Sequence, residues 1–217
     1  PLDIKGLGAG LSFTKDKTGD SRFTTTKVKL SGSYRYQLDS LQTVSAGMQF
    51  SYVNRGLSTE DLHFDNQYNG FFFDPTLPKK ESLNRTSRSY INSNLGVNYT
   101  YTPKDRVKIS GGVSMYNLNT PKQTFFSNDN IALDRRVNIH INGQYPMTRK
   151  IDILPSFLLS TQGSYKELLF GGSGKYTLVD NITAYRAVYL GLWTRTGDAT
   201  FLNIGFDYNE WYFGASY

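Results

Sequence analysis

Side chains of alternating character dominate several long segments of this chain. Between residues 26 and 36, one set of alternate positions holds Val28, Leu30 and Tyr34, and the other set holds lysine, serine and arginine. Because successive side chains of a β-strand point to opposite faces, this pattern predicts a strand with one apolar and one polar face. The same alternation recurs in residues 43–52, 94–101, 136–142, 202–208 and 211–217.

Counted along the chain, the alternating segments predict about eleven strands. Most of them reach the length of about 9–11 residues that a tilted strand needs to cross the hydrocarbon layer. The fold class we predict is therefore an all-β, antiparallel transmembrane β-barrel. Because closed single-chain bacterial barrels have an even number of strands, we expect residues 1–217 to form one barrel domain that is incomplete at one or both ends. The predicted strands are residues 4–14, 22–37, 43–55, 88–102, 106–118, 135–145, 151–162, 165–178, 185–195, 199–208 and 210–217.

The composition supports strands and argues against other classes. The chain has 14 Phe, 16 Tyr and 20 Gly, its mean hydropathy is -0.45, and no apolar run is long enough for a membrane-spanning helix. It has no Cys, and His63 and His140 are its imidazoles, so we expect no disulfide, metal or cofactor. The net charge of +6 comes from basic residues scattered along the chain, which argues against a nucleic-acid partner.

The connections between the predicted strands alternate between short and long. Barrels of the bacterial outer membrane have short periplasmic turns and longer external loops. The parity therefore predicts an integral outer-membrane protein whose connections at 15–21, 56–87, 119–134, 163–164 and 196–198 face outward. Aromatic side chains near the strand ends suit the membrane boundaries, where an apolar ring with one polar group is stable. These are Tyr34, Tyr36, Tyr52, Tyr99, Tyr101, Tyr145, Tyr176, Tyr208 and Trp211.

The two long outer loops, 56–87 and 119–134, hold the least generic residues. Phe71, Phe72 and Phe73 are consecutive, and such an apolar cluster is costly in water unless it folds over the barrel or contacts a partner. We therefore hypothesise that these loops bind a partner polypeptide. The candidate residues are Asp65, Asn66, Gln67, Tyr68, Phe71, Phe72, Phe73, Asn119, Pro121, Gln123, Phe125, Phe126, Arg135 and Arg136.

The polar faces of the predicted strands carry a basic bias that Asp152, Glu167 and Asp207 offset only in part. One interpretation is a lumen that attracts anionic groups, and the other is a solvated interior whose charges pair with a plug or with loops. The candidate lumen residues are Lys27, Lys29, Arg35, Lys108, His140 and Lys175.

Two groups of residues resemble catalytic motifs superficially. Residues 171–177 read Gly-Gly-Ser-Gly-Lys-Tyr-Thr, but a phosphate-binding loop needs Ser or Thr directly after Lys and a helix beyond it. His140, with Ser110, Ser114 and Asp152 on nearby strands, is compatible with an esterase, but alternation alone places such residues on any polar barrel face. We expect no enzymatic activity.

Several segments share their order and spacing with one known family. They are Leu11–Asp20 with Lys-Thr-Gly-Asp, Leu62–Gly70 with Phe-Asp-Asn-Gln-Tyr, Pro103–Asp105, Tyr116–Phe126 with Asn-Leu-Asn-Thr-Pro-Lys-Gln-Thr-Phe-Phe, Ile153–Ser156, Gly163–Leu168 with Lys-Glu-Leu, and Tyr189–Trp193. Together they resemble the PorP/SprF family, outer-membrane barrel proteins of the type IX secretion system of Bacteroidota. Members of that family are longer, and the resemblance implies about fourteen strands in the intact barrel.

The resemblance also implies a role. It points to a non-enzymatic protein that assists the secretion or surface attachment of large adhesins, including those of gliding motility, by binding their C-terminal domains. It implies other secretion or motility components as partners, among them periplasmic proteins or lipoproteins, besides the outer-membrane lipid. The residues alone leave a rival open: a general diffusion porin with a mild anion preference.

Overall fold

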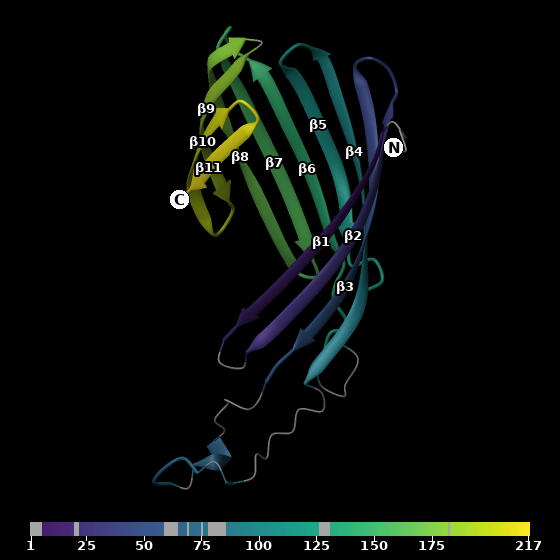
Figure 1. The fold of residues 1–217 in the computed structure, drawn as a ribbon, viewed down its shortest axis with the longest axis vertical. Helices are drawn as coiled ribbons and strands as arrows, with labels where there is room; N and C mark the ends of the chain where they lie inside the picture. Colours follow the sequence, from purple (N-terminus) through teal and green to yellow (C-terminus); the bar gives the residue numbers. More distant parts are fainter. Residues whose placement is uncertain are drawn as a thin grey trace.

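One antiparallel sheet of eleven strands makes up the folded part of the chain (Figure 1). The computed structural model describes residues 6–19, 22–58, 65–68, 70–74, 76–77, 86–125, 131–181 and 183–217. The strands are β1 (Leu7–Thr18), β2 (Phe23–Gln37), β3 (Gln42–Gly56), β4 (Ser87–Lys104), β5 (Val107–Tyr116), β6 (Arg136–Pro146), β7 (Ile151–Gln162), β8 (Tyr165–Asn181), β9 (Ala184–Arg195), β10 (Ala199–Tyr208) and β11 (Trp211–Ser216). A short 3-10 helix, η1 (Asp65–Gln67), lies between β3 and β4.

The strand prediction is confirmed in number, order and nearly all boundaries. Each strand pairs with its neighbours in sequence, so the chain runs up and down through the sheet. The glycine-rich residues 171–177 lie within β8, as a kinked strand and not a phosphate-binding loop. A Cβ on Gly171 would stand 2.3 Å from the carbonyl oxygen of Leu192 on β9, which explains why the strand has no side chain there.

The first strand ends later than predicted. The sequence pattern predicts a strand at 4–14 and a loop at 15–21, but β1 continues to Thr18. Lys15 and Lys17 pair in register with Thr residues of β2. The predicted boundary is wrong because the run Lys-Asp-Lys-Thr has the composition of a turn, whereas the backbone hydrogen bonds that β2 offers hold it in the ladder.

The two faces of the sheet have opposite chemistry. The register aligns one row across eight strands on the outer face: Leu7, Tyr34, Ala46, Val97, Val113, Ile139, Leu159 and Leu168. Large apolar side chains on this face are exposed, as in Leu11 (76%) and Ile91 (61%). In the described part of the chain, Val53, Ala187 and Pro121 are the buried residues with apolar side chains, and the other buried side chains are polar. This reverses the arrangement of a water-soluble domain and fits a wall that faces lipid.

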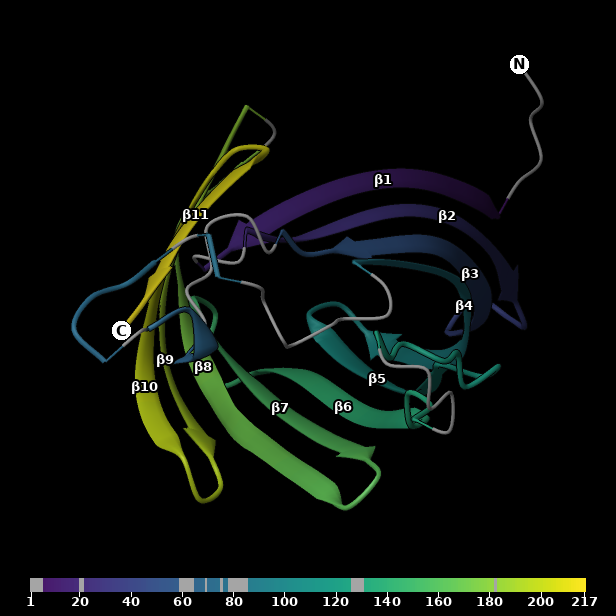
Figure 2. The same cartoon turned by 90° about the horizontal axis from the view of Figure 1, so that it is seen from below.

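The sheet curls strongly (Figure 2). Its polar side chains lie on the concave side, where Asn98 of β4 meets His140 of β6. Among the described strands, β1 pairs with β2 and β11 with β10, so the sheet is open between its two edges. Its curvature, its antiparallel order and its outward apolar face fit a fragment of a transmembrane β-barrel. No helix within the described residues is long and apolar enough to span a membrane.

The strand connections define two ends of the sheet. At the loop end lie the connections 19–22, 57–86, 117–135, 163–164 and 196–198, and at the turn end lie 38–41, 105–106, 147–150, 182–183 and 209–210. Exposed aromatic residues gather near the turn end: Tyr34, Tyr36, Tyr99, Tyr145, Tyr176, Tyr208 and Trp211. Such a row of amphipathic rings suits the boundary between lipid and water.

Candidate functional site

The described part of the first long loop is a small folded tip. Tyr68 and Phe73 form an antiparallel bridge, and the amide N–H of Asp74 donates to the carbonyl oxygen of Gln67 at 2.7 Å. The side chain of Gln67 is buried, and its Nε2 donates to the carbonyl oxygen of Leu77 at 3.4 Å. These bonds give the tip a structure of its own, without strands of the sheet.

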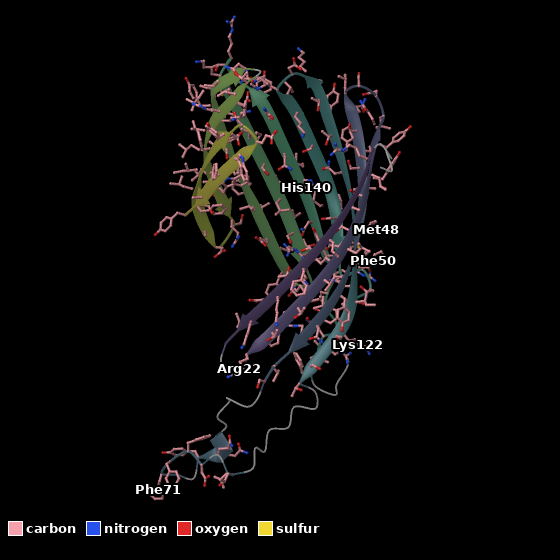
Figure 3. All side chains as sticks on the ribbon, viewed as in Figure 1. Arg22, Met48, Phe50, Phe71, Lys122 and His140 are labelled. Atoms are coloured by element: carbon pink, nitrogen blue, oxygen red, sulfur yellow. The ribbon has the colours of Figure 1, made fainter. Side chains whose placement is uncertain are left out.

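The tip presents its aromatic residues outward. Phe71 is 89% exposed and Phe72 is 62% exposed, and Figure 3 shows Phe71 at the far end of the loop from the strands. We predicted that this loop folds over the barrel or contacts a partner, and Figure 1 shows its described tip beyond the ends of β3 and β4. Asn66 lies in η1 and is half-buried, whereas the side chain of Asp65 is outside the described residues.

Asp74 closes the tip with a local turn. Its Oδ1 accepts hydrogen bonds from the backbone N–H of Thr76 at 2.9 Å and from the hydroxyl of Thr76 at 2.6 Å. Both hydrogen bonds lower the pKa of this carboxyl below its ordinary value of 3.8. The bond from the Thr76 hydroxyl has the larger effect, and the bond from the backbone N–H has the smaller. The tip is therefore best ordered when Asp74 is ionised.

The second long loop, between β5 and β6, is tied to the sheet. β5 ends at Tyr116, and Asn119 continues its ladder: the side-chain Oδ1 accepts from the backbone N–H of Ser93 at 3.1 Å, and Nδ2 donates to the carbonyl oxygen of Ile91 at 2.7 Å. The side-chain amide thus takes the place of a peptide group beside β4. Pro121 is buried, and its carbonyl oxygen accepts from the N–H of Leu133 at 2.9 Å.

The same loop reaches from β5 and β6 to β2 and β3. The Nη1 of Arg55 on β3 donates to the side-chain oxygen of Gln123 at 2.7 Å. The ring of Phe125 packs edge-on against Phe23 on β2 with 6.1 Å between centroids, and the Arg55 guanidinium lies 4.9 Å from the centre of the Phe23 ring. Gln123 and Phe125 therefore join the loop to the concave face, and Phe126 lies outside the described residues.

Beside this loop is a cavity of about 440 Å³ on the concave face at the loop end. Its wall includes three cations, Lys27 and Lys29 on β2 and Arg136 on β6, and no carboxylate. In the described part of the chain no acidic group lies within ion-pair distance of these three side chains. The rest of the wall is mostly amide and hydroxyl: Gln49, Ser51, Val53, Tyr90, Asn92, Asn94, Tyr116, Asn117, Leu133, Asn138 and Gln162.

The arginine pair next to the cavity has split roles. Arg136 donates from Nε to the hydroxyl of Ser160 at 2.8 Å and to the side-chain oxygen of Asn138 at 3.1 Å, so its guanidinium is held against the wall. Arg135 is exposed, and its Nε donates to the carbonyl oxygen of Leu118 at 3.3 Å. Only the first of these two cations contributes to the cavity.

At the turn end the concave face holds a compensated charge cluster. Asp152 on β7 has no exposed surface, and it forms an ion pair with Arg106 at 2.5 Å and another with Lys175 on β8 at 3.7 Å. The amide of Gln144 donates to the second carboxylate oxygen at 3.0 Å. Lys175 also lies 5.2 Å from the centre of the Tyr185 ring. This cluster satisfies a buried carboxylate from several strands.

The remaining lumen candidates lie between these groups or at the turn end. His140 faces Asn98 across the concave side, with Nε2 and Oδ1 3.1 Å apart, and Figure 3 places it in the middle of the sheet. Asp152 is engaged elsewhere, so the residues considered for an esterase are not brought into a hydrogen-bonded chain. Arg35 and Lys108 are exposed near the turn end.

A family model places the chain. It describes type IX secretion system membrane proteins of the PorP/SprF type, and it matches residues 1–217, the whole chain. This chain belongs to the PorP/SprF family. No curated protein matches it. Membership in PorP/SprF makes it a membrane protein of the type IX secretion system, which accounts for the apolar outer face of the sheet.

Sequence reasoning missed how this PorP/SprF chain organises its loop end. The buried residues Asn94 and Asn117 were not singled out, yet Asn117 donates to the carbonyl oxygen of Asp134 at 2.8 Å and links β4, β5 and the loop. The one available signal was the row of asparagines on alternate positions of β4, namely Asn92, Asn94 and Asn98.

Proposed function

We propose that this protein is an integral outer-membrane barrel that binds the C-terminal domain of a large secreted adhesin at its loop end. This binding assists the secretion or surface attachment of the adhesin, which is of the gliding-motility type. The role is one of binding and not of catalysis. The observation that carries the proposal is the folded tip with Phe71 (89% exposed) and Phe72 (62% exposed), because a protein does not keep such rings in water without use for them.

The second long loop favours this role over a general diffusion porin. Its described part lies against the concave face of β2 and β3 at the loop end, where Gln123 and Phe125 hold it. A loop held inside the mouth narrows a pore. We therefore expect the intact barrel to give no large, steady conductance in a planar bilayer, whereas a porin would give one.

The direct test is to replace Phe71 and Phe72 together with Ser in the native cell. We expect the adhesin on the cell surface to fall severely, while the amount of barrel in the membrane stays unchanged. Leu38→Ser with Leu41→Ser is the matched control, because these exposed apolar residues lie in a connection at the turn end. Undiminished display after the Phe substitutions, or equal loss after the Leu substitutions, would refute the proposal.

A further inference from the structure

Most side-chain amide oxygens in the wall of the loop-end cavity already accept hydrogen bonds from other residues of the fold. The side-chain oxygen of Gln49 accepts from Asn94 at 3.0 Å, and that of Asn94 accepts from the backbone N–H of Asn117 at 3.1 Å. The side-chain oxygen of Asn117 accepts from Asn92 at 2.7 Å. The oxygen of Asn138 is taken by Arg136. The side-chain N–H groups of Gln49, Asn92, Asn94 and Asn117 are also bonded within the fold, so the cations are the main polar groups left to bind a ligand.

The positive charges of this cavity oppose folding. Lys27 and Lys29 occupy alternate positions of β2 and point to the same side, and Arg136 borders the same space. Like charges at this spacing repel, and partial burial weakens the screening by water. Glu167 and Asp198, which line a second cavity together with Arg136, both form ion pairs with Arg195. A cluster that costs stability in the free protein is typical of a site that meets an anion.

The proposed function narrows the chemistry of that anion. A partner polypeptide that reaches the loop end carries carboxylates, and their charge complements the three cations of the wall. The Oδ1 of Asn92 has no hydrogen-bond partner in the described part of the chain, but it is buried and does not face the cavity. A cavity of about 440 Å³ admits a short piece of chain and no folded domain.

From these observations we infer that the loop-end cavity binds a carboxylate of a partner polypeptide, with Lys27, Lys29 and Arg136 as the cationic contacts. This inference rests on the proposed function, since it names the chemical group by which the bound polypeptide engages the barrel. The carboxylate is either that of an acidic side chain or that of the chain's C-terminus, and the two sources have the same chemistry.

The test measures binding of short fluorescent peptides to the purified barrel in detergent. The first peptide has an acidic residue and a free C-terminus, the second has the acidic residue and a C-terminal amide, and the third has Gln in place of the acidic residue and a free C-terminus. We expect at least one carboxylate-bearing peptide to bind, with affinity that falls as salt rises. Whichever substitution abolishes binding identifies the source of the carboxylate.

Lys29→Gln, and separately Lys27→Gln, should weaken that binding by about tenfold or more, because each removes a charge-assisted hydrogen bond. Lys29→Arg keeps the charge and should retain most of the affinity. Lys150→Gln removes the same charge from an exposed turn at the turn end and should leave binding unchanged. The thermal stability of Lys29→Gln should equal or exceed that of the parent protein, which separates loss of a site from loss of the fold.

Three results would overturn the inference. The first is equal binding of a fourth peptide that has Gln in place of the acidic residue and a C-terminal amide. The second is binding by the lysine variants that equals that of the parent. The third is lysine-dependent binding of an acidic polysaccharide such as polygalacturonate without binding of any peptide. Failure of the proposed function looks different, because adhesin display would then survive the Phe71 and Phe72 substitutions whatever the peptides do. The peptide experiment can refute carboxylate binding in the cavity while the Phe71 and Phe72 substitutions still abolish adhesin display, so the two experiments distinguish the two cases.

Discussion

The two ends of the concave face differ in whether their cations have a carboxylate partner. At the turn end, Arg106 and Lys175 surround the fully buried Asp152, so the charges are matched within the fold. At the loop end, Lys27, Lys29 and Arg136 share a cavity wall that has no carboxylate. In the first arrangement the fold depends on the carboxylate, because removal of Asp152 would leave two cations without their counter-charge. The second arrangement destabilises the free protein through repulsion between the cations, and a bound anion would relieve that repulsion.

The largest effect should follow removal of the buried carboxylate. Asp152→Ala leaves two cations and an amide of Gln144 without their acceptor, and we expect a loss of about 3–5 kcal/mol in the free energy of unfolding. Denaturant unfolding of the refolded barrel measures it. Asp198→Ala breaks an exposed ion pair with Arg195 and should change the free energy of unfolding far less, because water screens such pairs. Similar losses for the two variants would abolish the contrast between the ends.

The amide network of the loop end comes next in size. Asn117 is buried, makes hydrogen bonds with Asn92, Asn94 and the carbonyl oxygen of Asp134, and has a positive φ of 57° that Asn tolerates better than Ala. We expect Asn117→Ala to cost about 2 kcal/mol and to free the second loop for proteolysis.

Asn142→Ala is the control for this change. Asn142 lies on the concave face of β6 but is exposed and accepts one bond from Ser156. Its loss should fall within about 0.5 kcal/mol. A loop that stays resistant to protease in the Asn117 variant would show that charge, and not the amide network, organises this end.

The smallest predicted effect concerns the aromatic tip. Because the pKa of Asp74 is lowered in the folded tip, its hydrogen bonds to Thr76 stabilise the turn above the ordinary carboxyl pKa of 3.8 and are lost as the pH falls through the lowered value. We expect hydrogen exchange at the Thr76 amide to speed up at that acidic pH, beyond the intrinsic pH dependence measured in Asp74→Asn. An unchanged protection factor across this range would contradict the assigned contact.

Features of the fold could be predicted from the sequence when they depend on residues close together along the chain, and could not when they depend on distant segments. Alternation is local, so the strands and their two faces were predictable from runs such as residues 43–52. The end of β1 was mispredicted because its pairing with β2, and not its own composition, holds Lys15 and Lys17 in the ladder. Strand pairing is a property of two segments at once.

The sites depend on longer distances still. Placing Lys175 beside Asp152 and Arg106 requires the register of β7 and β8 and the position of the turn before β5, which no spacing along the chain reveals. Likewise, the bond from Arg55 to Gln123 joins residues 68 positions apart. The sequence therefore showed that the inner face is basic, and only the fold showed which cations are compensated.

The central claim is that a partner polypeptide enters the loop end of the concave face. A photo-reactive amino acid placed at Asn138 on β6, in the cavity wall, or at Asn142 on the same face of the same strand tests it in living cells. The account predicts a covalent adduct between the Asn138 variant and the C-terminal domain of a secreted adhesin, and little or none from the Asn142 variant. Adducts of equal yield at both positions, or no adduct at Asn138 while the adhesin is being exported, would contradict it.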